Sequence, residues 1–407
     1  MTNTMADPAG TVGSAPDVAE LVTRTRQFVR DEVLPVEDTF DGDVTAAGGD
    51  HLRRQLQEGA RTRGLLAPHA PVEYGGRGLS MTERARVFEA AGYSVFGGLA
   101  INAAAPDEGN MHLLAHVATP AQREQYLAPL VRGEMRSAFA MTEPAPGAGS
   151  DPAALKTSAT RVAGGWRIDG RKTFITGADG AGFFIIMART RGEVGERGGG
   201  TMLLAPAGAP GLQVGRHVPT MDRSMVGGHC EVIFDGLVVP DEAVLGEVDQ
   251  GFSYAQVRLG PARMTHVMRW LGAAVRAHEV AVEYAARRQG FGSAIADLGM
   301  GQQMIADNEI DLAATRALLD VACVALDTGS SASQETSIAK TFGGEAIGRV
   351  VDRAMQLCGG MGVSADLPVA RIAREVRPFR VYDGPSEVHR FAIAKRAVKA
   401  ARLRTSS

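Results

Sequence analysis

Hydrophobic and polar positions along the chain change their period twice. From Val18 to about Arg136, apolar residues recur every three or four positions, which is typical of amphipathic helices. The first helix, beginning at Val18, is expected to end at Pro35, because proline lacks the N–H that a helix interior uses. Further helices are expected near residues 51–64, 82–95 and 120–132. This first zone therefore predicts a helical domain.

Between about Ser137 and Gly246 the pattern changes to short β-rich runs separated by Gly, Pro and Asp. The runs are "WRIDGRKTFITG", "FFIIMART", "TMLLAPA", "LQVGRHV" and "CEVIFDGLVVP". No helix of ordinary length fits between them, so a doubly wound parallel sheet is not expected. An antiparallel barrel or sandwich fits better. The stretch "GWRIDGRKT" at 165–173 is interpreted as a β-hairpin.

From about Gly251 the helical period returns. Four apolar residues recur every seven positions and predict a long helix with a seam for a bundle or a second subunit: Ile305, Leu312, Leu319 and Leu326. Further helices are expected near 334–357 and 386–403. The order predicts an α+β chain with a disordered tail at 1–17, a helical domain at 18–137, a β-domain at 138–246 and a helical bundle at 247–407.

Composition narrows the functional classes. The 407 residues carry a net charge of -3, with 45% hydrophobic and 22% charged residues, so neither nucleic acid nor an anionic membrane is an expected partner. Residues 1–17 lack the features of a signal peptide, and no run is suited to span a membrane. The three cysteines, Cys230, Cys323 and Cys358, lie far apart, which favours a reduced, cytoplasmic compartment. No histidine spacing predicts a metal site.

Several short segments carry candidate chemistry. "MTEPAPGAGSD" at 141–151 is rich in small residues and hydroxyls, so it is either a ligand-contacting turn or an inter-domain loop. Asp383, in "VYDGPSEVHR" at 381–390, precedes a helical pattern. It is either a helix-entry charge or a base that points into a pocket.

These segments together resemble the acyl-CoA dehydrogenase family. "MTEPAPGAGSD" resembles the family's TEP-x-GSD, and "GRKTFITGA" at 170–178 resembles its K-W-I-T strand. "RRQGFG" at 287–292, "QLCGGMG" at 356–362 and "VYDGPSEVHR" follow in the family's order. The resemblance implies an N-terminal helical domain, a middle antiparallel β-barrel and a C-terminal four-helix bundle. It also implies FAD as cofactor and a homodimer or homotetramer.

The resemblance assigns cofactor contacts residue by residue. Met141 and Thr142 would contact the flavin ring, Thr176 would reach its N5 side and Phe174 would pack on it, unless Phe174 belongs to the barrel core. Ser150 would lie near the pyrophosphate or the pantetheine. Contacts to the neighbouring subunit's FAD would come from the C-terminal motifs: Arg288, Phe291, Gln356, Gly359 and Gly360, with Glu387 as a further cofactor residue. Arg288 could instead be a surface charge.

Asp383 occupies the position where the family commonly has a catalytic Glu. The resemblance implies that it removes the α-proton of an acyl-CoA thioester, and that its own backbone N–H stabilises the enolate oxygen. Some members place a base before the residue equivalent to Arg263, but Ala262 offers none here. Substrate contacts are expected from six residues, of which the last two suggest a polar acyl tail or are only helix caps: Ser150, Arg263, Tyr382, Gly384, Asp107 and Asn110.

The leading functional hypothesis is an acyl-CoA dehydrogenase of fatty acid metabolism that passes electrons to an electron-transfer flavoprotein. A flavin oxidase resembling nitroalkane oxidases, which also use Asp, is the alternative, and a binding protein that has lost catalysis is a third. "APDEGNM" at 105–111 and the Asp of "DGPSEVH" resemble the branch whose animal members are fused to an aminoglycoside-phosphotransferase-like domain. The chain length leads us to expect only the dehydrogenase part.

Overall fold

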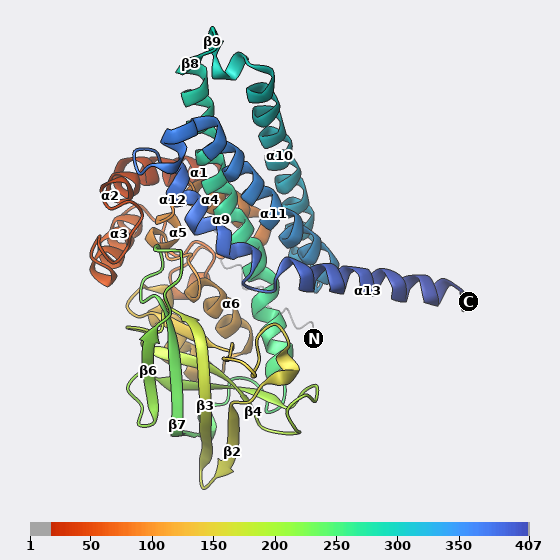
Figure 1. Cartoon of the computed structure of the whole chain (residues 1–407). Helices are drawn as coiled ribbons and strands as arrows, with labels where there is room; N and C mark the ends of the chain where they lie inside the picture. Colours follow the sequence, from red (N-terminus) through yellow and green to blue (C-terminus); the bar gives the residue numbers. More distant parts are fainter. Residues whose placement is uncertain (1–17, 406–407) are drawn as a thin grey trace, which may run out of the picture.

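The computed structural model describes residues 18–405; the predicted disordered tail at 1–17 lies outside them. The first part of the chain is helical (Figure 1). Its elements are α1 (Val18–Phe28), η1 (Val29–Val33), α2 (Leu34–Thr39), α3 (Asp50–Thr62), η2 (Val72–Tyr74), α4 (Met81–Ala91), α5 (Gly97–Ala100), α6 (Asp107–Val117), α7 (Pro120–Gln122), η3 (Arg123–Leu127) and α8 (Ala128–Val131).

A sheet domain and a second helical part follow. The sheet domain contains β1 (Ser137–Ala140), η4 (Pro152–Ala154), β2 (Ser158–Val162), β3 (Gly165–Thr176), β4 (Phe183–Arg189), β5 (Gly200–Pro206), β6 (Leu212–His217), β7 (His229–Pro240) and η5 (Asp241–Ala243). The last part contains α9 (Gly251–Arg287), β8 (Gln289–Gly290), β9 (Ser293–Ala294), η6 (Ile295–Asp297), α10 (Gly299–Asp327), α11 (Ser333–Cys358), η7 (Gly359–Val363), α12 (Val369–Val376), η8 (Arg377–Arg380) and α13 (Ser386–Thr405).

Helix α9 connects the two ends of the molecule. In Figure 1 it runs from the sheet domain to the β8–β9 hairpin, while α13 projects away from the body. Helix α11 packs against α9, α10 and α13, and α4 from the first part packs against α9 and α10. On α10, Leu312 and Leu319 are buried, and Ile305 and Leu326 pack against the same core, as the seven-residue repeat predicted.

The expected end of the first helix at Pro35 is wrong. The chain passes through the π-turn η1 and continues as α2, with Pro35 in the first turn of α2. The N–H of Leu34 bonds to the carbonyl of Val29, five residues back. A wider turn directly before the proline accommodates its ring and its missing donor, so the helix does not have to stop.

The sheet is mostly antiparallel, but not entirely. Its strand order is β1-β4-β2-β3-β7-β6, with β5 paired to β4. Strand β1 runs parallel to β4, and β2 pairs with β4 in parallel at one residue, so these two pairings depart from the antiparallel arrangement expected from sequence. Strand β4 buries both faces: Phe183 and Ile185 pack toward the helices, whereas Phe184 and Ile186 pack inside the sheet domain. This explains why its sequence is continuously apolar.

The predicted hairpin at 165–173 is also wrong. These residues belong to the single strand β3, and the turn of the β2–β3 hairpin lies just before it, at 163–164. The Asp169–Gly170 pair marks a shift in the β3–β7 register instead of a turn. A Cβ on Gly170 would lie 2.5 Å from Oγ1 of Thr157, so glycine is needed for close approach rather than for chain reversal.

A buried ion pair fixes the loop that enters the sheet domain. The Lys172 ammonium lies 2.9 Å from the Glu143 carboxylate, and both side chains are almost fully buried. Lys172 also donates to the carbonyl of Met141, and Glu143 accepts from the backbone N–H groups of Lys156 and Thr157. Burial alone would raise the pKa of Glu143, but Lys172 and these donors lower it to about 2. The ion pair therefore holds both ends of the loop, at Met141 and at residues 156–157.

We expect Glu143→Ala to lower the free energy of unfolding by about 3–5 kcal/mol, because it leaves a buried ammonium unpaired. Urea unfolding followed by circular dichroism measures this loss. The matched control is Glu134→Ala, which breaks the exposed Arg132–Glu134 pair and should cost no more than about 1 kcal/mol. Equal small losses in the two variants would show that the Glu143–Lys172 pair does not stabilise the loop.

Candidate functional site

Asp383 lies in a tight turn between η8 and α13. Its φ is +54° and that of Gly384 is +95°, both in the left-handed region. The glycine adopts this conformation freely, whereas Asp383 is strained by it. Pro385 follows, and α13 begins at Ser386. The turn therefore presents Asp383 just before a helix, as the sequence predicted, and something else must hold it in shape.

Side chains from three helices hold the carbonyl groups of this turn. Lys340 of α11 donates to the carbonyls of Phe379 (2.9 Å) and Gly384 (2.7 Å). Arg263 of α9 donates through Nε to the carbonyl of Asp383 at 2.9 Å, and His389 Nε2 lies 3.2 Å from the same oxygen. Arg263 was predicted to contact substrate, and its Nε is engaged by the turn itself.

The Asp383 carboxylate is partly enclosed among cationic and polar side chains. Its side chain is 18% exposed, and Oδ2 lies 3.3 Å from Nε2 of His266 on α9. Burial alone would raise the pKa of Asp383, but His266, Arg258 and Arg263 lower it well below its ordinary value. The carboxylate is therefore ionised at neutral pH and able to accept a proton.

Tyr382 points into the helices behind Asp383. Its hydroxyl accepts a hydrogen bond from Trp270 Nε1 at 2.5 Å and lies 3.4 Å from Nδ1 of His266. Its ring stacks at a tilt against His266 and Phe379. Burial raises the pKa of Tyr382, which keeps the phenol protonated. Tyr382 thus supports the turn, and its predicted contact with substrate remains a prediction.

On the sheet domain, the segments predicted to meet a flavin lie side by side. Thr173 N–H bonds to the carbonyl of Thr142, and Lys172 bonds to that of Met141, which joins the entry loop to β3. Phe174 has a φ of +54° and is 55% exposed, so it is not a core residue of the sheet domain. Ser150 is exposed in the same loop.

Thr176 is the first member of a hydrogen-bonded chain. Its hydroxyl lies 2.9 Å from Nδ1 of His229, and Nε2 of His229 lies 2.7 Å from the Asp222 carboxylate. The neighbouring Ser224 is tied to Glu375 of α12 at 2.6 Å. Sequence reasoning did not find His229, Asp222 or Glu375.

The remaining predicted cofactor residues lie on exposed surface. Arg288 caps the C-terminal end of α9 and is exposed, and Phe291 at the tip of the β8–β9 hairpin is 98% exposed. Gln356 and the glycines that follow α11, Gly359 and Gly360, are exposed as well. Glu387 lies exposed in the first turn of α13. Their predicted contacts with FAD remain predictions.

The two predicted substrate residues of α6 contact protein groups. Asp107 accepts from the N–H (2.8 Å) and the hydroxyl (2.6 Å) of Ser137. Asn110 is fully buried, donates to Ser137 Oγ at 2.8 Å and accepts from Arg258 Nε at 2.7 Å. Both side chains thus fasten α6 to β1 and α9, and substrate contact by either one stays a prediction.

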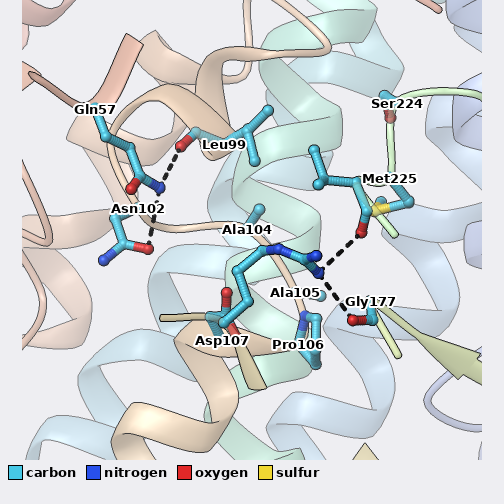
Figure 2. A pocket seen from close by; sticks show the side chains of 12 residues that line it. Gln57, Leu99, Asn102, Ala104, Ala105, Pro106, Asp107, Gly177, Ser224 and Met225 are labelled. Atoms are coloured by element: carbon cyan, nitrogen blue, oxygen red, sulfur yellow. Dashed lines mark hydrogen bonds between the residues drawn. The ribbon is translucent and has the colours of Figure 1, made fainter. Parts of the chain in front are cut away.

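Asp107 also lines a small cavity, shown in Figure 2 beside Pro106 and Gly177. Its volume is about 20 Å³, which is enough for a water molecule and far too little for an acyl chain. Arg136 borders it and donates to the carbonyl of Gly177 at 2.8 Å. This cavity is therefore part of the contact between the first helical part and the sheet domain.

Comparison with known families identifies the family to which this fold and site belong. The N-terminal, middle and C-terminal domain models of acyl-CoA dehydrogenases match residues 16–134, 138–237 and 249–398. The chain belongs to the acyl-CoA dehydrogenase family. Acyl-CoA dehydrogenation, as an FAD-dependent oxidoreductase reaction of acyl-CoA thioesters, is accordingly its general activity.

Individual relatives agree along almost the whole chain. The Mycobacterium tuberculosis protein FadE2 is 36% identical over 92% of this chain and 93% of its own length. The (R)-benzylsuccinyl-CoA dehydrogenase of Thauera aromatica is 34% identical over 91% of this chain and 93% of its own. Acyl-CoA dehydrogenase family member 11 of Rattus norvegicus is 33% identical over 92% of this chain but only 50% of its own length. The assignment to a fused branch stays a prediction.

A solved structure shares the architecture. The butyryl-CoA dehydrogenase of Megasphaera elsdenii superposes with a TM-score of 0.83 at 26% identity, over 98% of this chain and 100% of its own. The predicted family fold is thereby confirmed. Among the helices of residues 18–405, none is long and apolar enough to cross a membrane.

The residues present suit FAD. The joined segments at 141–142 and 174–176 offer an exposed aromatic ring and two hydroxyls, which fit a flat ring system edged with polar atoms. A Cβ built on Gly359 or Gly360 would meet nothing within 4 Å, so the backbone there is open to a ligand. Arg288 supplies an exposed guanidinium suited to a pyrophosphate.

We expect Asn110→Leu to lower the free energy of unfolding by about 1–3 kcal/mol, because it strips buried partners from Arg258 and Ser137. Thermal or urea unfolding measures this change. His116→Ala, on the exposed side of α6, is the control and should shift stability by less than about 0.5 kcal/mol. Unchanged stability with a raised KM would instead favour direct substrate contact by Asn110.

Proposed function

We propose that the chain dehydrogenates an acyl-CoA thioester between its α and β carbons, with Asp383 as the base that takes the α-proton. One observation carries the proposal: an ionised carboxylate, partly enclosed and still 18% exposed, stands on a turn whose carbonyls are clamped by three helices. A fixed, charged acceptor is what proton abstraction from a weak carbon acid requires.

The reaction balances as the loss of a proton and a hydride. The α-proton moves to the Asp383 carboxylate, and a double bond forms between the two carbons of the product. FAD, when bound, supplies the acceptor for the β-hydride. By resemblance, the backbone N–H of Asp383 donates to the thioester oxygen and stabilises the charge that develops there. Thr142 and Thr176 would hold the cofactor from the sheet domain.

We further propose an electron-transfer flavoprotein as the electron acceptor and a homodimer or homotetramer as the working assembly. A structure concerning the electron-transferring flavoprotein of Acidaminococcus fermentans contains a chain 26% identical to this one, with a TM-score of 0.84. The exposed Phe291 and the open glycines after α11 would reach a cofactor in a neighbouring subunit.

Asp383→Asn is expected to slow anaerobic bleaching of the flavin by acyl-CoA at least about 100-fold, because the amide cannot accept the proton. The measurement is a stopped-flow visible spectrum with short, medium, branched and 4-hydroxylated acyl-CoAs. Asp383→Glu keeps the carboxylate and should retain more activity. An Asp383→Asn enzyme that bleaches at the wild-type rate would disprove the role of Asp383 as base.

The same stopped-flow measurement distinguishes the alternative function, a flavin oxidase acting on nitroalkanes. If no acyl-CoA bleaches the flavin, nitroalkanes are added next. Rapid reoxidation of the reduced protein by oxygen would favour the oxidase. Slow reaction with oxygen and rapid reaction with an electron-transfer flavoprotein would favour the dehydrogenase.

Arg288→Ala is expected to weaken FAD retention, because a lost charged hydrogen bond costs about 1.5–3 kcal/mol, or about ten- to hundredfold in Kd. The ratio of flavin to protein absorbance after gel filtration measures it. The adjacent Arg287, exposed and paired with Glu283, is the control site. Arg287→Ala should leave retention unchanged, and equal retention in both variants would remove Arg288 from the FAD site.

A further inference from the structure

His266 lies close to the Asp383 carboxylate, and sequence reasoning did not identify it. It lies on α9, is buried, and places Nε2 3.3 Å from Oδ2 of Asp383. That oxygen is buried and has no hydrogen bond of ordinary geometry. The two groups therefore form a close pair that a small movement would convert into an aligned hydrogen bond.

The contacts of the second ring nitrogen, Nδ1, determine which nitrogen of His266 carries the proton. Arg269 places a terminal guanidinium nitrogen 2.9 Å from Nδ1 of His266, and a guanidinium can only donate. Nδ1 must therefore be the unprotonated nitrogen. The proton of the neutral ring is then on Nε2, facing Asp383. Arg269 is itself held by a 2.7 Å hydrogen bond to the carbonyl of Ala103, so this arrangement is fixed from the first helical part.

Tyr382 favours the same tautomer. Its hydroxyl accepts from Trp270 and lies 3.4 Å from Nδ1 of His266, so its own proton is available to that nitrogen. The charged and titratable groups that act on the ring are Arg269, Asp383, Tyr382 and Glu108. Burial, and after it Arg269, lowers the pKa of His266, in agreement with a neutral ring.

We propose that His266 is a positioning residue for Asp383, whose Nε2–H holds one carboxylate oxygen and leaves the other to receive the α-proton. The inference rests on the proposed role of Asp383 and adds the group that orients it. An aspartate is one methylene shorter than the family's usual glutamate, so its carboxylate has little freedom to find the substrate by itself. A fixed hydrogen-bond donor behind the carboxylate instead holds it in one orientation toward the substrate.

The test compares His266→Leu with His266→Gln in the FAD-loaded enzyme. Leucine removes the donor at similar volume, and we expect flavin bleaching to slow about 10- to 100-fold with little change in KM. Loss of the donor also raises the pKa of Asp383, so the acid limb of the rate profile should move to higher pH. Glutamine can place an amide N–H near the position of Nε2 and should restore much of the rate.

His278 provides a matched control on the same helix. It is equally buried, and its Nε2 lies 3.0 Å from a carboxylate oxygen of Glu309, but it is more than three helical turns farther along α9. His278→Leu should leave the pH profile unchanged. A His266→Leu enzyme with wild-type rate and profile, beside an inactive Asp383→Asn enzyme, would overturn the inference alone. An active Asp383→Asn enzyme would overturn the proposed function and this inference with it.

A second measurement determines the tautomer in the unsubstituted protein and uses a variant only to assign the signal. Nitrogen NMR of the unsubstituted protein labelled at histidine distinguishes the two neutral tautomers and the imidazolium. We expect the signal that disappears in the most conservative His266 variant to be that of a neutral ring protonated at Nε2. A ring protonated at Nδ1, or at both nitrogens at neutral pH, would overturn the proposal.

Discussion

The buried ammonium of Lys340 is the contact on which the geometry of the Asp383 turn depends. It joins the carbonyls on either side of the turn, those of Phe379 and Gly384, to α11. A left-handed conformation costs a non-glycine residue such as Asp383 about 1–2 kcal/mol. Hydrogen bonds from a charged donor are worth about as much each, so the clamp offsets the strain. Arg263 adds a third bond from α9.

Helix α9 brings the remaining parts of the site together because its buried cations need partners elsewhere. Arg258 bonds to Asn110 of α6, Arg269 to the carbonyl of Ala103, and Arg276 to the buried Glu37 of α2. Each of these partners lies in the first helical part. Removing a partner would leave a buried charge, which is costly, so the contacts fix the position of α9. The same helix then presents Arg263 and His266 to Asp383.

The sequence predicted those features that follow from local pattern. The apolar periods located most elements, and the motif order placed Asp383, Thr176 and the segments predicted to face the flavin in a known architecture. The alternative of Phe174 as a core residue is decided only by the structure, which exposes it. Local rules failed at Pro35 and at Asp169–Gly170, because a π-turn and a strand irregularity use the same residues as a helix end and a hairpin.

The partners of Asp383 could not have been predicted in this way. His266, Lys340 and Arg269 lie on helices whose apolar pattern they interrupt without any motif of their own. A buried polar residue in a helix shows that it needs a partner, but not which one. Their relation to Asp383 arises from the crossing of α9 and α11 beside the turn.

The hydrogen-bond donors behind Asp383 all point toward its carboxylate, which affects how strong a base the proposed role allows it to be. Trp270 donates to Tyr382, the Tyr382 hydroxyl and Arg269 face Nδ1 of His266, and the ring turns its remaining proton to the carboxylate. Such a chain stabilises the charged acceptor and so makes it a weaker base. The large difference in acidity between the carboxylic acid and the α-carbon must then be reduced on the substrate, by hydrogen bonds to the thioester oxygen as charge develops. These hydrogen-bonded side chains fix the position of the carboxylate. The turn that carries Asp383 also carries the N–H that the family resemblance assigns to the thioester oxygen. The proposed base and the proposed oxyanion donor thus belong to one residue, in a turn fixed by hydrogen bonds to the carbonyls of Phe379, Asp383 and Gly384.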